Sequence, residues 1–177
     1  MKRTIFLLLA VLINGRARAQ YHPVDQGSSL NFTVRNFGIE VGGSFTGVKG
    51  IISFDPANLP ASMFDVNIDA ASVNTDNSMR DGHLRDDSYF DVKNYPKIHI
   101  TSTSVSPGKK GMYIINGSLT IKKQSKAISF PFSATPTDDG YLFKGTFTIN
   151  RKDFDVGGTS TISDKVDIML NVNTKKN

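Results

Sequence analysis

The sequence predicts an all-β protein whose strands close into an eight-stranded antiparallel barrel, and three observations favour this fold. Clusters of Gly, Pro, Asn and Asp recur roughly every 10 to 20 residues after residue 20, as turns between short strands do. Between the turns, apolar and polar residues alternate, so each strand has one apolar face. Closing such a sheet on itself removes both exposed edges, and eight strands enclose room for packed side chains or one slender ligand.

The alternation marks several clear strands and two weaker ones. The clear strands carry apolar residues within 30–34, 64–68, 113–121, 128–132, 141–149 and 166–172, and the weaker runs are 43–54 and 97–105. In the 43–54 run the apolar phase slips after Phe45, where Gly47 and Gly50 permit a β-bulge. Pro131 cannot donate to a β-ladder, so it predicts a seam, an edge or a bulge in its strand.

A short helical insertion is expected around residues 76–90, where the alternation stops. Asp76 or Asn77 can cap it, and Met79, His83 and Leu84 are expected on one side of one or two helical turns. The helix should end before the extended Tyr95-Pro96 pair.

The first nineteen residues are typical of a signal peptide. Lys2 and Arg3 precede an apolar run, and Ala17-Arg18-Ala19 offers the small-x-small pattern that signal peptidase cleaves. The apolar run is about ten residues long, whereas a membrane-spanning helix needs roughly twenty. We therefore expect a signal peptide at 1–19, a single β-barrel domain at 20–177 that begins at Gln20, and a periplasmic or secreted protein. A buried N-terminal helix is the alternative, but it would need a polar face and a cap.

Composition excludes several functional classes. The sequence has no cysteine, which excludes disulfides, thiolate chemistry and a lipoprotein anchor. The formal net charge is +5, but without the four basic residues of the leader the balance is 17 Lys and Arg against 16 Asp and Glu. A chain so close to neutral lacks the positive surface that nucleic-acid binding requires.

The inward phase of the strands defines the residues expected to line the barrel. They are Phe32, Val34, Phe64, Val66, Ile68, Ile115, Phe130, Phe132, Phe143 and Phe147. Gly117 and Gly145 lie on the same phase and are expected to leave space among the phenylalanines. Periodicity alone leaves two interpretations open, a ligand cavity or a solid core.

Several motifs resemble those of the YceI family. They are Ser28-Ser29-Leu30-Asn31-Phe32, Gly43-Ser44-Phe45-Thr46-Gly47, Phe54-Asp55-Pro56, Met79-Arg80-Asp81-Gly82-His83-Leu84, Tyr89-Phe90-Asp91-Val92, Tyr95-Pro96-Lys97, Gly117-Ser118-Leu119-Thr120-Ile121 and Asn150-Arg151-Lys152-Asp153-Phe154. The resemblance covers about residues 21–172. It implies an extended lipocalin-like barrel that holds a polyisoprenoid or a similar long-chain lipid. Two residues depart from the pattern, since many members have His in place of Asn36 and Gly in place of Asp155.

His83 lies in a dense group of charged residues, but the sequence supports neither a metal site nor catalysis there. The other histidines, His22 and His99, are far away in sequence, and no Gly-x-Ser-x-Gly turn occurs. We expect no cofactor and no metal, and we expect Asp81 and His83 to hold the helix on the barrel through hydrogen bonds. Arg80, His83 and Arg85 are candidate contacts for a ligand's head group, because guanidinium groups pair well with phosphate or carboxylate.

The leading hypothesis is an exported lipid-binding protein, not an enzyme, whose partner is a long-chain lipid in a storage, transport or stress role. The alternative is a secreted structural or stress protein with a solid barrel and no ligand, and an enzyme is the third hypothesis. Transient membrane contact and a homodimer are both left open.

Overall fold

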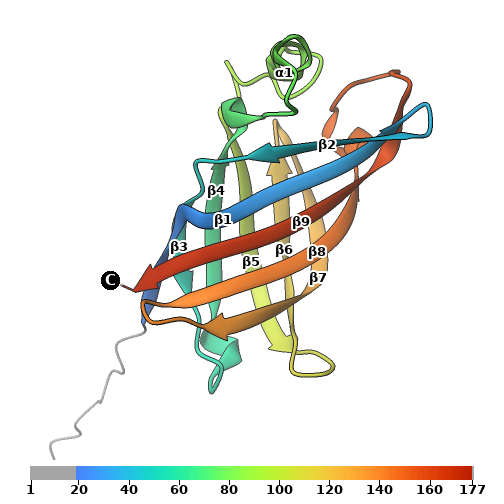
Figure 1. Cartoon of the computed structure of the whole chain (residues 1–177). Helices are drawn as coiled ribbons and strands as arrows, with labels where there is room; N and C mark the ends of the chain where they lie inside the picture. Colours follow the sequence, from blue (N-terminus) through green and yellow to red (C-terminus); the bar gives the residue numbers. More distant parts are fainter. Residues whose placement is uncertain (1–18, 177) are drawn as a thin grey trace, which may run out of the picture.

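The computed structural model describes residues 19–176, which form an antiparallel barrel with a short helix at one end (Figure 1). The strands are β1 (Gln20–Asn36), β2 (Ile39–Phe45), β3 (Lys49–Ser53), β4 (Met63–Asp69), β5 (Lys97–Pro107), β6 (Tyr113–Ile121), β7 (Gln124–Pro136), β8 (Tyr141–Asn150) and β9 (Ile162–Lys176). The helices are α1 (Ser78–Arg85) and the 3-10 turns η1 (Leu59–Ala61), η2 (Ala70–Ser72) and η3 (Arg151–Phe154).

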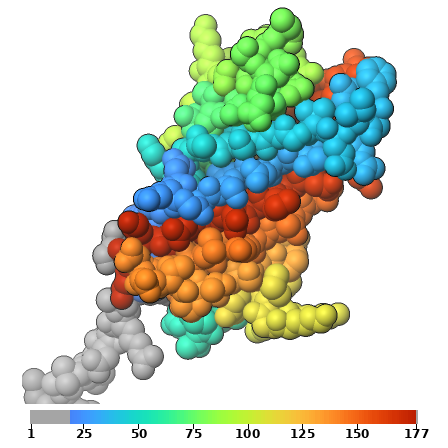
Figure 2. All heavy atoms as spheres, in the orientation of Figure 1, coloured from blue at the N-terminus to red at the C-terminus, as the bar shows by residue number. Residues whose placement is uncertain are grey.

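The barrel closes because β1 pairs on both of its sides. The sheet runs β2-β1-β3-β4-β5-β6-β7-β8-β9, and β1 also pairs along most of its length with β9. The predicted closed eight-stranded antiparallel barrel is confirmed, with one additional strand. On the face shown in Figure 2, side chains of β1 and β9 lie directly against one another.

The additional strand arises where the sequence predicted a bulge. The 43–54 run divides into β2 and β3, and Gly47 at the break has φ +73°. The carboxylate of Asp25 accepts hydrogen bonds from the backbone N–H groups of Gly47 (3.1 Å) and Val48 (3.0 Å). Those two donors are therefore satisfied although the ladder is interrupted. The break lets β2 pair with the second half of β1 while β3 pairs with its first two residues.

The predicted helical insertion is present as α1, at the end of the barrel where β4 finishes and β5 begins. Asn77 is the N-cap, and its side-chain oxygen accepts from the backbone N–H of Arg80. The expected shared side is wrong in part, because Met79 (75% exposed) and His83 are exposed, whereas Leu84 is partly buried. Within residues 19–176, no helix is both long and apolar enough to cross a membrane.

Pro131 lies next to a seam in the barrel wall, as its missing amide donor predicted. The ladder between β7 and β8 runs only from Phe132↔Gly145 to Pro136↔Tyr141. On the other side of that seam, β8 remains paired with β9 up to Asn150↔Lys165. Side chains close the wall where this ladder ends: the rings of Phe130 and Phe147 stack at a centroid distance of 4.3 Å.

Candidate ligand-binding cavity

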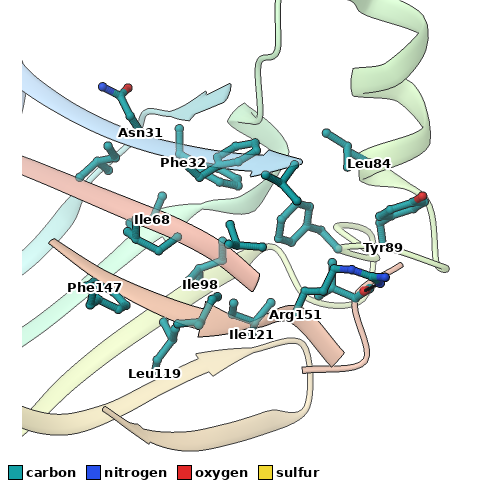
Figure 3. A pocket seen from close by; sticks show the side chains of 18 of the residues that line it. Asn31, Phe32, Ile68, Leu84, Tyr89, Ile98, Leu119, Ile121, Phe147 and Arg151 are labelled. Carbon is teal, nitrogen blue, oxygen red and sulfur yellow. Dashed lines mark hydrogen bonds between the residues drawn. The ribbon is translucent and has the colours of Figure 1, made fainter. Parts of the chain in front are cut away.

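Two adjoining cavities lie inside the barrel, and only apolar atoms face them. The larger has a volume of about 120 Å³ and the smaller about 70 Å³. Leu30, Ile68, Ile100 and Leu170 line both, so the two cavities follow one another along the barrel. Figure 3 shows the larger cavity, with Leu84 pointing from α1 towards it.

All ten side chains expected to line the barrel do line one of these cavities. The larger is lined by Phe32, Val34, Ile68 and Phe147, and the smaller by Phe64, Val66, Ile68, Ile115, Phe130, Phe132 and Phe143. The alternation that identified them reflects the β-pleat, which sends successive side chains to opposite faces. Asp65 and Asp69, on the other phase of β4, are exposed.

The glycines on the inward phase do not leave the space that was expected. A Cβ at Gly117 would lie 2.2 Å from the backbone oxygen of Thr101, so this glycine permits close approach of β5. A Cβ at Gly145 would lie 2.9 Å from the ring of Phe130. The room at Gly145 is therefore filled by that ring, and the prediction of open space there was wrong.

An aromatic cluster closes the barrel end opposite α1. Phe54, which follows β3 and is 4% exposed, packs edge-on against the rings of Tyr113 (5.1 Å), Tyr141 (5.2 Å) and Phe143 (5.4 Å). Phe54 lines neither cavity, so the smaller cavity ends at this aromatic cluster. Burial raises the pKa of Tyr141, and the neighbouring Tyr21 raises it further.

The larger cavity opens towards the α1 end. Its lining there includes Leu84, Phe90 and Ile162, which are only partly buried. Phe45 of β2 lies between two other lining rings, 5.5 Å from Phe32 and 5.4 Å from Phe90. These three aromatic side chains form the mouth array, and all three are partly exposed.

Arg151 is the charged residue of the cavity lining, and sequence reasoning did not select it. It is 3% exposed, and Figure 3 shows it near Tyr89 at the edge of the cavity. All five N–H donors of its guanidinium are used: Nε donates to the Ser163 oxygen, Nη1 to the Val156 and Gly158 oxygens, and Nη2 to the Ile162 oxygen and to Asp164 Oδ1. Arg151 therefore organises the chain between η3 and β9, and it has no donor left for a ligand. The sequence signal that could have identified Arg151 was its place in the motif Asn150-Arg151-Lys152-Asp153-Phe154.

None of the three candidate head-group residues lines either cavity. Arg80 donates to Thr75 Oγ1 (2.7 Å) and the Thr75 carbonyl oxygen (2.6 Å), and Arg85 donates to the carbonyl oxygens of Ala71 and Val73, both at 2.8 Å. Asp81 accepts from the backbone N–H and the hydroxyl of Thr75, as expected for a residue that holds α1 in place. The same expectation was wrong for His83, which is exposed.

Asp155 and Asn36, where the sequence departs from the expected pattern, both make side-chain hydrogen bonds. Asp155 adopts a left-handed conformation with φ +55°, where glycine is most easily accommodated, and its carboxylate accepts from Gln124 Nε2 at 2.7 Å. Asn36 accepts from Thr161 Oγ1 at 3.1 Å, which ties the end of β1 to the chain before β9. Neither residue lines the cavities.

Among residues 19–176 there is no group of three or more His, Asp or Glu side chains placed to hold a metal ion. The two histidines with ring hydrogen bonds are apart from the cavities: His99 Nε2 meets Asp65 Oδ1 at 2.8 Å, and His22 Nδ1 meets the Gly50 oxygen at 3.0 Å.

A closed antiparallel barrel with an apolar interior is the architecture of lipocalin-like binding proteins. The model of the YceI-like domain matches residues 21–174, and the chain belongs to this family. A "UPF0312 protein" of Ectopseudomonas mendocina (strain ymp) is 32% identical, with 94% of this chain and 93% of the relative covered.

Two solved structures share the fold. BcnA of Burkholderia cenocepacia superposes with a TM-score of 0.79 at 24% identity, over 85% of this chain and 98% of that one. A polyisoprenoid binding domain from Saccharophagus degradans, described as implicated in plant cell wall breakdown, gives a TM-score of 0.73 at 17% identity, over 89% and 98% of the two chains. Both superpositions show that the chain has this barrel fold.

Proposed function

We propose that this protein holds one long apolar chain, of the polyisoprenoid class, along the axis of its barrel. The observation that carries the proposal is the run of two adjoining cavities, faced only by apolar atoms, between the aromatic cluster at Phe54 and the mouth array. An apolar chain is the ligand that such a wall accepts without leaving a polar group unpaired. The neighbour described as a polyisoprenoid binding domain supports this ligand class.

A long ligand enters only if lining side chains move. Cavities of about 120 and 70 Å³ are smaller than the roughly 300–1,000 Å³ of ordinary ligand sites. The mouth array is suited to such movement, because all three of its rings are partly exposed and the Phe45 ring lies 5.5 Å from that of Phe32 and 5.4 Å from that of Phe90. Each buried methylene contributes about 0.8 kcal/mol, so a few isoprene units exceed the ~8 kcal/mol of micromolar binding before ordering costs.

Head-group recognition contributes little to this affinity in our proposal. Arg80, Arg85 and Arg151 all donate to protein oxygens, so a head group would have to displace one of those bonds. We assign no catalytic residue, and a pH-dependent turnover of any substrate would contradict the binding role.

The small cavity volume favours one alternative, a secreted structural or stress protein with a solid barrel. Extraction of the purified native protein with organic solvent, followed by mass spectrometry of the extract, separates the two. If the protein holds a long apolar chain, the extract should contain an apolar molecule in near-stoichiometric amount, and the delipidated protein should bind a fluorescent polyene chain. If the extract is empty and the polyene does not bind, the barrel is solid.

We further propose that the protein is exported and that residues 1–19 are removed, although residues 1–18 lie outside the described part of the structure. Intact-mass measurement of exported protein should give a chain that begins at Gln20. A cut a few residues away would correct the boundary, and a mature protein that retains the leader would contradict export.

A further inference from the structure

The hairpin of β1 and β2 carries two large apolar side chains that are not buried in the barrel, Phe37 in the turn and Ile39 at the start of β2. Phe37 is 80% exposed and Ile39 is 71% exposed. Phe37 also has φ +49°, a left-handed conformation that L-residues with bulky side chains disfavour. Packing and backbone preference would both select a different residue at this position, so neither explains the phenylalanine.

This turn lies at the rim of the cavity mouth. Asn36, the residue before Phe37, pairs with Ile162 and accepts from Thr161 Oγ1. Ile162 itself lines the larger cavity. In Figures 1 and 2 the β1–β2 hairpin projects from the upper part of the barrel, at the end that also carries α1.

The turn is also electrically neutral. Its flanking charges, Arg35 and Glu40, pair with each other at 3.2 Å across the hairpin, and the residues between them carry no charge. An apolar, uncharged tip matches the interface of a zwitterionic bilayer, where the hydrophobic effect supplies the attraction and anionic lipids are not required.

We propose that Phe37 and Ile39 insert into the surface of a zwitterionic phospholipid bilayer and so bring the mouth of the barrel against the membrane. The inference rests on the proposed function. A long apolar chain that leaves a bilayer for the barrel then crosses little water, because the turn that enters the bilayer and the rim of the cavity are paired through Asn36 and Ile162.

The test uses a variant that removes the apolar tip without harming the fold. Phe37→Asn introduces a residue that tolerates the left-handed conformation, and Ile39→Thr keeps a β-branched side chain in the strand. The matched control is Ile51→Thr with Met63→Thr, since these side chains are 37% and 45% exposed near the opposite end. Both double variants should unfold cooperatively at midpoints close to that of the wild type.

Three measurements on the mature protein are needed: flotation with phosphatidylcholine vesicles, the transfer rate of a fluorescent polyene chain from those vesicles, and binding of the same polyene delivered from detergent. The tip variant should lose vesicle binding and transfer rate by at least tenfold and bind the detergent-delivered polyene as the wild type does. The control should match the wild type throughout. Raising the salt to about 1 M, where the screening length is about 3 Å, should leave vesicle binding unchanged.

The outcomes separate this inference from the proposed function. Wild-type protein that does not float with vesicles, or a tip variant that transfers the polyene at the wild-type rate, would overturn membrane docking. A wild-type dimer that the tip variant converts to a monomer would assign the turn to a second copy of the chain, which also overturns it. Failure of the wild type to bind detergent-delivered polyene would instead refute the proposed function, that the barrel holds a long apolar chain.

Discussion

The rings of Phe130 and Phe147 stack nearly parallel, 4.3 Å apart with an interplanar angle of 15°, next to the point where the ladder between β7 and β8 ends. Aromatic stacking thus takes the place of backbone pairing there. Phe130 lines the smaller cavity and Phe147 the larger. The stack therefore belongs both to the wall and to the proposed ligand path.

The first prediction concerns the coupling of these two rings. In a double-mutant cycle, Phe130→Leu and Phe147→Leu should show a coupling of about 0.5–1.5 kcal/mol in the free energy of unfolding, because each ring loses its stacked partner. Chemical denaturation of the four proteins measures it. The cycle of Phe147→Leu with Phe54→Leu is the control and should be additive within about 0.5 kcal/mol. Equal coupling in both cycles would show that the stack has no special role.

A second prediction tests whether the interior must stay free for a ligand. In Gly145→Trp the indole enters the region held by the Phe130 ring, because even a Cβ there lies 2.9 Å from it. Overpacking should cost about 1–3 kcal/mol of stability and abolish binding of a fluorescent polyene, while unfolding stays cooperative. The matched variant Lys144→Trp, at an exposed neighbouring position, should bind normally. A Gly145→Trp protein that binds the polyene with unchanged affinity would place the ligand elsewhere.

The phase of β4 gives a third prediction. Val66→Asp places a charge against the smaller cavity and should cost several kcal/mol, on the order of 3 or more, because the residues that line this cavity are all apolar. Asn67→Asp, on the opposite face and across from His99, should cost under about 1 kcal/mol. Thermal and denaturant unfolding compare the two costs directly. Equal costs would contradict the assignment of Val66 and Asn67 to different faces, and a larger cost for Asn67→Asp would mean that the faces are interchanged.

Arg151 gives a fourth prediction, on stability and not on ligand selection. Arg151→Met removes the buried guanidinium donor from four carbonyl oxygens and from Asp164, which should cost about 3–5 kcal/mol. Lys152→Met removes an exposed partner of the same carboxylate, 3.0 Å away, and should cost under about 1 kcal/mol. A change in head-group preference without loss of stability in Arg151→Met would show that the guanidinium meets the ligand.

The fifth prediction concerns alkaline pH. Burial, with smaller contributions from Tyr21, Tyr113 and Asp55, raises the pKa of Tyr141 above its ordinary value of 10.0. Below pH 10 the phenol is neutral in both states, so its contribution to stability is intact. As the pH rises further the unfolded state loses the proton first, and this contribution is lost through the raised pKa of the folded state. Tyr141→Phe should therefore lose less stability than the wild type between about pH 8 and about pH 11. Parallel losses would contradict the assignment.

The fold class and the inward positions of the strands could be predicted from the amino-acid sequence, because both depend on a local property. In a β-strand, successive side chains alternate between faces, so the inward positions at Phe64, Val66 and Ile68 can be read without a partner strand. Asn77 and Pro131 carried equally local information, since a helix cap needs a side-chain acceptor and proline lacks an amide donor.

Features that depend on which strands meet became visible only in the folded protein. Gly145 looks like open space in the sequence, yet a ring from the adjacent strand fills it, and the free capacity of the interior follows from such contacts. Arg80 and Arg85 looked available to a head group, but oxygens on a neighbouring segment already accept from both. Arg151 meets its five acceptors because the chain folds back before β9. The exposure of Phe37 likewise depends on how the β1–β2 hairpin is placed against the other described strands. Alternation fixes a side chain's face, whereas its neighbours depend on contacts between distant parts of the chain, which a local pattern does not encode.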